Sequence, residues 1–323
     1  MEGLRWHLTN TEIEEQRLMA TNYENQYFTI RVREDRTQFM FTCSTARTHG
    51  DVSKTIEVST DEGSTWTKYT AKYEYHNGQA TITPCVFTLD RNQTMMIRGT
   101  GDYSLCCNYF FYLTEYRYSV IATDDNGEIV FDENGKEVLL SRSGSLDIEG
   151  NVMSLVNGDN YLNGTLKGND LRAFFRGLNV VNANNLVLPI NVKDGCFAYM
   201  FSECGKITAP PTLPATTLAS DCYYKMFAGS SIVTAPELPA TSLARGCYYG
   251  MFTGCGNLVN PPSILPATSD AEDCYNRMFS GCIELERKPE IRLTKANYYR
   301  VGNRWTCSNE HMFYGCEKLP ETD

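Results

Sequence analysis

Residues 213–229 read LPATTLASDCYYKMFAG, and residues 238–255 read LPATSLARGCYYGMFTGC. A shorter related stretch, EDCYNRMFSGC, occupies residues 272–282. Each copy contains a Met-Phe pair whose phenylalanine serves as an anchor, and a degenerate first copy ends in Phe174-Phe175. The six anchors are Phe175, Phe201, Phe227, Phe252, Phe279 and Phe313, which lie 26, 26, 25, 27 and 34 residues apart. Such a period is typical of architectures that stack one supersecondary unit per repeat.

Each repeat divides into two halves. Leu218, Cys222 and Met226 recur every four residues, which predicts a short helix with one apolar stripe. Gly229, two residues after its anchor, predicts a helix end with a positive φ. The stretch at residues 232–238, interrupted by Pro236 and followed by proline, predicts a short strand. The predicted repeat core consists of Phe201, Phe227, Phe252, Phe279, Phe313, Cys222, Cys247 and Cys274.

Cysteines form two columns in the repeats, five residues before and three residues after the anchors. Nine of the 13 cysteines lie in the repeats, and none of them forms a C-x-x-C pair, so we expect neither zinc nor any other metal or cofactor. A disulfide between the two columns of one repeat is an alternative, although Ser230 leaves Cys222 without a counterpart. We interpret these cysteines mainly as small buried core residues.

The three quoted stretches resemble the BspA-like branch of leucine-rich repeat proteins, and the resemblance covers about residues 150–323. The resemblance implies a solenoid on secreted or surface proteins of gut and oral anaerobes, or on phage-encoded proteins, that serves adhesion and recognition without catalytic residues. A strand plus a helix in each repeat agrees with this, and we expect an α/β solenoid of about six leucine-rich-repeat-type rungs at residues 149–323.

The N-terminal half has a different pattern. Two overlapping capping-box spacings predict a helix at residues 11–19, inside a docking segment at residues 1–25. Alternating Phe28, Ile30 and Val32 begin a series of short runs bounded by polar turn residues, which predicts an all-β, sandwich-like domain at residues 26–148.

One motif in this half invites an enzymatic interpretation. Residues 59–66, STDEGSTW, resemble the S-x-D-x-G-x-T-W Asp-box of sialidase-like propellers. Such propellers carry several copies, and this chain has one. We therefore expect a hairpin in which Asp61 bonds amides of its own turn, Gly63 supplies an unusual φ and Trp66 packs beneath.

Charge and hydropathy exclude several classes of partner. The net charge of −10 and the absence of a Lys/Arg cluster argue against nucleic acid. The chain has no run of 18 apolar residues, so we expect no membrane insertion. Its first residues show no signal-type hydrophobic stretch, so either a signal has been lost or the protein leaves the cell another way, such as release with a phage particle by lysis.

A tyrosine column is the predicted binding surface. Tyr224 and Tyr249 follow the first cysteine of their repeats by two residues, and Tyr299 is a candidate continuation. Helical geometry places Tyr223 in the core and its neighbour outward, where a ring with a hydroxyl suits a sugar or protein partner.

Together these features predict a non-enzymatic structural and recognition protein. We expect a phage virion component such as a fibre, tail or capsid decoration, assembled as a homo-oligomer with other virion or surface proteins and binding a host-surface glycan or protein. One alternative is a secreted or cell-surface adhesin of a gut anaerobe. An alternative of another class is a glycan-cleaving enzyme that uses Asp61.

Overall fold

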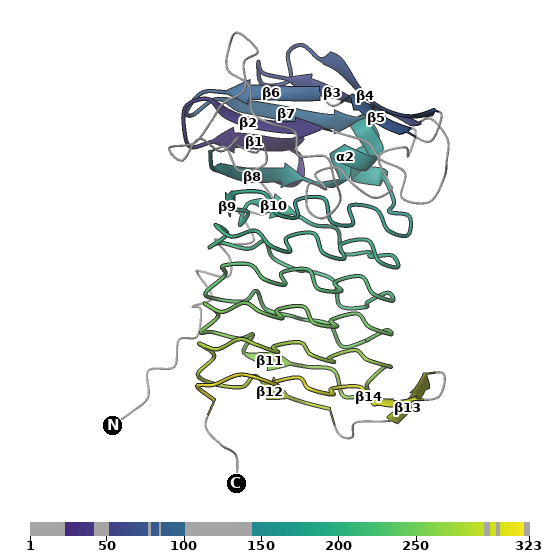
Figure 1. The fold of residues 1–323 in the computed structure, drawn as a ribbon. Helices are drawn as coiled ribbons and strands as arrows, with labels where there is room; N and C mark the ends of the chain where they lie inside the picture. The colour runs from purple at the N-terminus through teal and green to yellow at the C-terminus, as the bar shows by residue number, and fades with distance from the viewer. Residues whose placement is uncertain are drawn as a thin grey trace.

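The computed structural model describes residues 23–41, 52–76, 79–83, 85–100, 144–293, 298–301 and 304–319 of the 323-residue chain. The helix predicted at residues 11–19 lies outside the described residues. Figure 1 shows a strand-rich region at one end of the molecule, from which the repeats extend as successive layers.

Most described strands lie in or next to one open sheet. The strand-rich region consists of β1 (Phe28–Val32), β2 (Thr37–Phe41), β3 (Val52–Ser59), β4 (Thr67–His76), β5 (Gln79–Thr83), β6 (Cys85–Leu89), β7 (Thr94–Gly99), β8 (Leu146–Asn151), β9 (Val180–Asn182) and β10 (Leu186–Val187). The open sheet has eight strands in the order β10-β8-β1-β7-β3-β4-β5, with β9 paired to β8. A separate two-stranded sheet joins β2 and β6.

The alternation of β1 places its apolar side chains in the core. Phe28, Ile30 and Val32 are buried, as the period of two requires. β1 is a central strand that pairs antiparallel with both neighbours, so that Ile30 lies opposite Met95 of β7 and Ile148 of β8. Both edges of β1 are therefore bonded, which makes it an interior strand of the sheet.

The predicted α/β solenoid of leucine-rich-repeat-type rungs is wrong. Among the described residues, the regular secondary structure consists mostly of strands, with a short helix, α2 (Met153–Asn157), that precedes the repeats and is followed by the 3-10 helix η2 (Gly158–Asn163). No residue in the fully described range 164–293 is in an α-helix. The predicted sandwich-like domain at residues 26–148 is also corrected: its described strands belong to open sheets of eight and two strands, and the larger sheet includes β9 and β10 from beyond residue 148.

Each repeat instead forms a layer of consecutive tight turns. Within the layer of Phe227, the N–H groups of Cys222, Tyr224 and Met226 donate to carbonyls three residues earlier. The N–H groups of the intervening residues donate to the next layer, as in the bonds from Tyr223 to Cys247 and from Phe227 to Met251. Alternate residues thus close turns and link layers, so that the buried backbone is hydrogen-bonded without helices or long strands.

The turns need a left-handed residue at every fourth position. In the same layer Asp221, Lys225 and Gly229 have φ of 53°, 49° and 67°. The same position, two residues after the anchor, has positive φ in the other layers as well, where it is Gly177, Gly254, Gly281 or Gly315, and Glu203 takes the same conformation (φ 62°) where glycine is missing. Their role is different from the predicted one, because they continue a chain of turns instead of ending a helix.

The anchors form a continuous aromatic ladder through the layers. Phe201, Phe227, Phe252 and Phe279 are completely buried, whereas Phe313 in the last layer is partly buried. Ring centroids of successive anchors from Phe175 onward are 5.4–5.8 Å apart with interplanar angles of 22° or less. The anchors therefore pack ring on ring through the layers, although the backbone that positions them differs from the predicted one.

Short strands mark a few further contacts. β8 pairs in parallel with β9 and β10, which joins the sheet to the first layer. Two pairs of short strands lie farther along the described chain. β11 (Ile264–Leu265) pairs with β12 (Glu290–Ile291), and β13 (Tyr298–Val301) forms a hairpin with β14 (Arg304–Cys307) beside the last layers in Figure 1.

Candidate binding surfaces

Three tyrosines from consecutive layers stack in a row on the surface. The rings of Tyr224 and Tyr249 are nearly parallel, with centroids 4.9 Å apart and an interplanar angle of 7°. Tyr199 precedes them at 5.3 Å and 55°. All three side chains are half-buried. We call Tyr199, Tyr224 and Tyr249 the tyrosine row.

Tyr224, in the middle of the row, presents a ring edge and a hydroxyl group, not a ring face. Tyr224 lies between Tyr199 and Tyr249, so both of its faces are covered by neighbouring rings. A sugar therefore has no free face of Tyr224 to stack on. Tyr224 can instead contact a partner through its phenol hydroxyl, which both donates and accepts hydrogen bonds.

Cationic side chains flank the row. The Arg172 guanidinium lies 5.1 Å from the ring centroid of Tyr199, and the Lys225 ammonium lies 5.6 Å from that of Tyr224. Burial, and then the nearby phenols of Tyr199 and Tyr249, raise the pKa of Tyr224 above its ordinary value. The hydroxyl of Tyr224 is thus protonated at neutral pH and keeps its donor.

The structure brings together two of the three predicted binding residues. Tyr224 and Tyr249 are neighbours in the row, and their partners Tyr223 and Tyr248 are buried as expected. Tyr299 lies in the β13–β14 hairpin, outside the turn layers. The backbone of Arg277 bonds instead to Glu310, which occupies the position in the last layer that Tyr299 was expected to fill.

Tyr199 was missed by the sequence analysis. It stands one residue later in its repeat than Tyr224 does, at a position with φ of 60°. Its ring tilts to reach the row from there. The sequence does contain a signal for Tyr199, a tyrosine one position out of register with Tyr224. Helical spacing, however, places that position on a different face of the repeat.

The cysteines of the two columns lie in the core of the layers, and some of their thiols bond to backbone carbonyls. Cys196, Cys222, Cys247 and Cys274 are fully buried, and the nine described cysteines whose side chains are placed are all free thiols. In the second column the thiols of Cys255 and Cys282 donate to the carbonyls of Phe227 and Phe252, at 3.0 and 3.1 Å. The described residues contain no group of His, Cys, Asp and Glu suited to a metal ion.

Burial suppresses the reactivity of these thiols. Loss of solvation raises the pKa of Cys255 to about 11 and that of Cys204 to about 12. Neither thiol is a nucleophile at neutral pH, because the thiolate is the reactive form. Seven of the described cysteines in the two columns are buried in the core, and Cys316 in the last layer is partly buried.

The Asp61 motif is the predicted hairpin, between β3 and β4. Asp61 accepts bonds from the Ser59 hydroxyl and from the amide and hydroxyl of Thr65, at 2.7–2.9 Å. Gly63 has φ of 87°, and the Trp66 indole N–H donates to its carbonyl at 3.0 Å. The bonds from Thr65 and Ser59 lower the pKa of Asp61 to about 2. Both carboxylate oxygens thus serve the turn.

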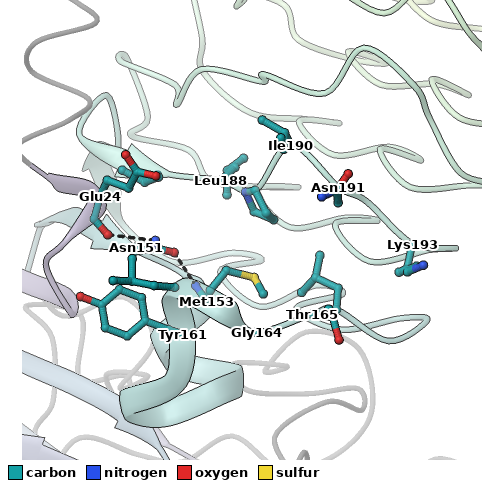
Figure 2. A pocket seen from close by; sticks show the side chains of 14 residues that line it. Glu24, Asn151, Met153, Tyr161, Gly164, Thr165, Leu188, Ile190, Asn191 and Lys193 are labelled. Atoms are coloured by element: carbon teal, nitrogen blue, oxygen red, sulfur yellow. Dashed lines mark hydrogen bonds between the residues drawn. The ribbon is translucent and has the colours of Figure 1, made fainter.

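A cleft opens where the sheet meets the first layer, and Figure 2 shows its walls. Its volume is about 490 Å³, within the roughly 300–1,000 Å³ typical of small-molecule sites. One wall comes from α2 and η2, including Met153 and Tyr161, and the other from the chain after β10, including Leu188 and Ile190. Neither wall was recognised in the sequence, because its segments are far apart in the chain.

Comparison with known proteins gives no relative. Neither a family model nor a curated protein nor a solved structure matches the chain. Within the described ranges, no helix combines the length and apolarity needed to cross a bilayer.

Proposed function

We propose that the protein is a non-enzymatic recognition protein whose layered region presents the tyrosine row to a glycan or protein on a host surface. The observation that carries this proposal is the parallel packing of Tyr224 and Tyr249 at 4.9 Å. It holds two phenol hydroxyls side by side at nearly the spacing of the layers.

Rigidity supports a role in recognition. Tyr224 and Tyr249 sit in consecutive layers joined by backbone bonds, such as that from Lys225 to Tyr249 at 2.8 Å. Hydroxyl groups held in this way lose little conformational freedom when a ligand binds, so more of the interaction energy contributes to affinity.

The surroundings of the row favour a polar partner. Arg172 and Lys225 add positive charge, whereas Asp221 on the adjoining turn adds a carboxylate whose pKa burial raises. A ligand with many hydroxyl groups, or a polar protein loop, can bond to phenols and to charges of both signs. These features suit specificity from hydrogen bonds more than from apolar burial.

The hairpin of Asp61 weighs against the glycan-cleaving alternative. A catalytic carboxylate needs a position at the reacting bond and a pKa suited to its role. Asp61 is fully exposed, and its oxygens bond to Ser59 and Thr65 of its own turn. Its geometry is that of a residue that stabilises a hairpin.

The test is binding of the whole protein to a glycan array and to cells of candidate hosts. Tyr224→Phe and Tyr249→Phe remove one hydroxyl each without removing the stacked ring. Each should weaken binding by about two- to tenfold, the contribution of one net hydrogen bond. Tyr314→Phe is the matched control, because Tyr314 is 70% exposed and lies outside the row. Unchanged binding by the double Tyr→Phe variant would remove the row from the proposal.

The virion location and the surface-adhesin alternative stay predictions. Mass spectrometry of purified phage particles and of bacterial envelopes from the source separates them. Detection in particles supports the virion component, and detection only in envelopes supports the adhesin.

A further inference from the structure

The cleft at the junction has two large apolar side chains that the fold itself does not bury. Leu162 of η2 is 57% exposed, and Ile190 after β10 is 66% exposed, although both line the cleft. In Figure 2, Ile190 extends from the layer wall, while Met153 and Tyr161 lie on the helical wall. Met153 and Leu188 also line the cleft with apolar atoms, although most of each side chain is buried.

Ile190 departs from the pattern of the repeats. Leu188-Pro189-Ile190-Asn191 corresponds to the Leu-Pro-Ala-Thr motif of the next three repeats. There the third residue is a small buried alanine: Ala215, Ala240 and Ala267 have exposed fractions of 1%, 1% and 0%. The repeat at the cleft therefore replaces a buried alanine with a large side chain that contributes to the cleft wall.

Two opposite charges lie at the two ends of the cleft. Figure 2 places Glu24 at one end and Lys193 at the other. Both residues are exposed, and among the described residues neither side chain forms an ion pair. A ligand with a cationic group at one end and an anionic group at the other would complement this arrangement.

Hydrogen bonds between separate segments connect the walls of the cleft. The Asn151 side chain donates to the Glu24 carbonyl at 3.0 Å and accepts from the Met153 N–H at 2.9 Å. The Val152 N–H donates to the Val187 carbonyl at 3.2 Å, which connects the layer wall to the chain that starts α2. These bonds hold three separate segments in fixed positions around the cleft.

We propose that this cleft binds a short apolar peptide. Its amino group would pair with Glu24, its carboxylate with Lys193, and an aliphatic side chain would contact Ile190 and the apolar surface beside it. A free peptide has this order of groups: a cation and an anion at opposite ends of an apolar segment. The site is separate from the tyrosine row, so this proposal does not depend on the proposed function.

The experiment uses the full chain and four probes: trileucine, N-acetyl-trileucine, trileucine amide and triglycine. Titration calorimetry gives the affinities, and NMR shifts of residues around the cleft give the location. Trileucine should bind saturably at the cleft, and triglycine should bind much more weakly. Acetylation or amidation should each weaken trileucine by about two- to fivefold, as expected for pairs at exposed charges.

Variants then assign each contact. Glu24→Gln should bind trileucine and its acetylated form equally, and Lys193→Gln should bind trileucine and its amide equally. Ile190→Ala, which restores the residue of the other repeats, should weaken trileucine by at least about tenfold. Val233→Ala is the control, because Val233 is 43% exposed and does not line the cleft.

Three results would overturn the proposal. The first is no saturable binding of trileucine at the cleft by folded wild-type protein. The second is equal affinity of wild type and Ile190→Ala, and the third is an acetylation effect that persists in Glu24→Gln. Because Ile190, Glu24 and Lys193 are exposed, circular dichroism should show these variants folded like the wild type.

Discussion

Phe28 of β1 stacks on Phe175 of the first layer, with ring centroids 5.5 Å apart and an interplanar angle of 27°. Phe175 in turn stacks on Phe201 at 5.4 Å. A side chain of the central strand therefore supplies the first ring of the aromatic ladder. The sheet covers the end of the layered region in the same way that each layer covers the previous one (Figure 1).

We predict that Phe175→Ala destabilises the protein by about 3–5 kcal/mol, the usual cost of deleting a buried phenylalanine. Phe175 is 1% exposed and contacts rings on both sides. Urea unfolding followed by circular dichroism measures the change. Val86→Ala, at a side chain that is 46% exposed, should change stability by less than about 0.5 kcal/mol.

A double-mutant cycle tests the contact itself. If the stacked pair couples the sheet to the layers, the combined loss in Phe28→Ala/Phe175→Ala should be smaller than the sum of the single losses by about 0.5–1.5 kcal/mol. Additive losses would show that the two rings stabilise their own regions independently.

The second prediction concerns Gly246. Its φ is 58°, and a Cβ there would lie 2.2 Å from Oδ1 of Asp221 in the preceding layer. Gly246→Ala should therefore cost at least about 1–2 kcal/mol for the left-handed backbone, with a further loss from the clash. Gly205→Ala is the matched control, because a Cβ there meets nothing within 4 Å. Thermal unfolding of both variants measures the difference.

Removing the Asp221 side chain separates the two causes. Asp221→Ala should recover part of the Gly246→Ala loss by relieving the clash, while the backbone cost remains. Full recovery in the double variant would show that the conformation of residue 246 carries no cost.

The sequence predicted which residues are equivalent but not the backbone that connects them. The register was correct because the anchors, such as Phe227 and Phe252, stack ring on ring. The helix was wrong because a four-residue recurrence fits both an α-helical stripe and a chain of tight turns. The discriminating signal was Gly246, Gly250 and Gly254, three glycines at four-residue spacing, since a helix has no place for repeated positive φ.

Function was less predictable than the core. The column of Tyr224 and Tyr249 follows from repetition, because equivalent residues in stacked layers must be neighbours. The cleft does not, because Glu24, Asn151 and Ile190 come from three segments that only the tertiary structure brings together. No local pattern in the sequence indicates that these segments lie close together.

The third prediction is that Arg277→Gly stabilises the protein by up to about 1 kcal/mol. Arg277 is exposed and has φ of 55°, a conformation that glycine adopts without the steric cost of a Cβ. Arg277→Ala keeps the Cβ and removes the charge, so it should leave stability nearly unchanged. Equal effects of the two substitutions in denaturant unfolding would mean that the guanidinium, not the backbone, decides the result.

The fourth prediction is a loss of stability at alkaline pH. Burial raises the pKa of Cys255 to about 11, above the roughly 8.5 of a thiol in an unfolded chain. The neutral buried thiol therefore contributes its full stabilisation of the folded state below about pH 8.5. This contribution to the free energy of unfolding is lost as the pH rises toward 11, by about 1.4 kcal/mol per pH unit for each such thiol. Urea unfolding under reducing conditions at pH 7 and pH 10 measures how the free energy of unfolding changes with pH.

The variant Cys255→Ser tests the contribution of this thiol, because the equivalent residue one layer earlier is already a serine, Ser230. The slope of the free energy of unfolding against pH should become smaller by the contribution of one thiol. An unchanged slope in this variant would show that Cys255 does not contribute to the pH dependence.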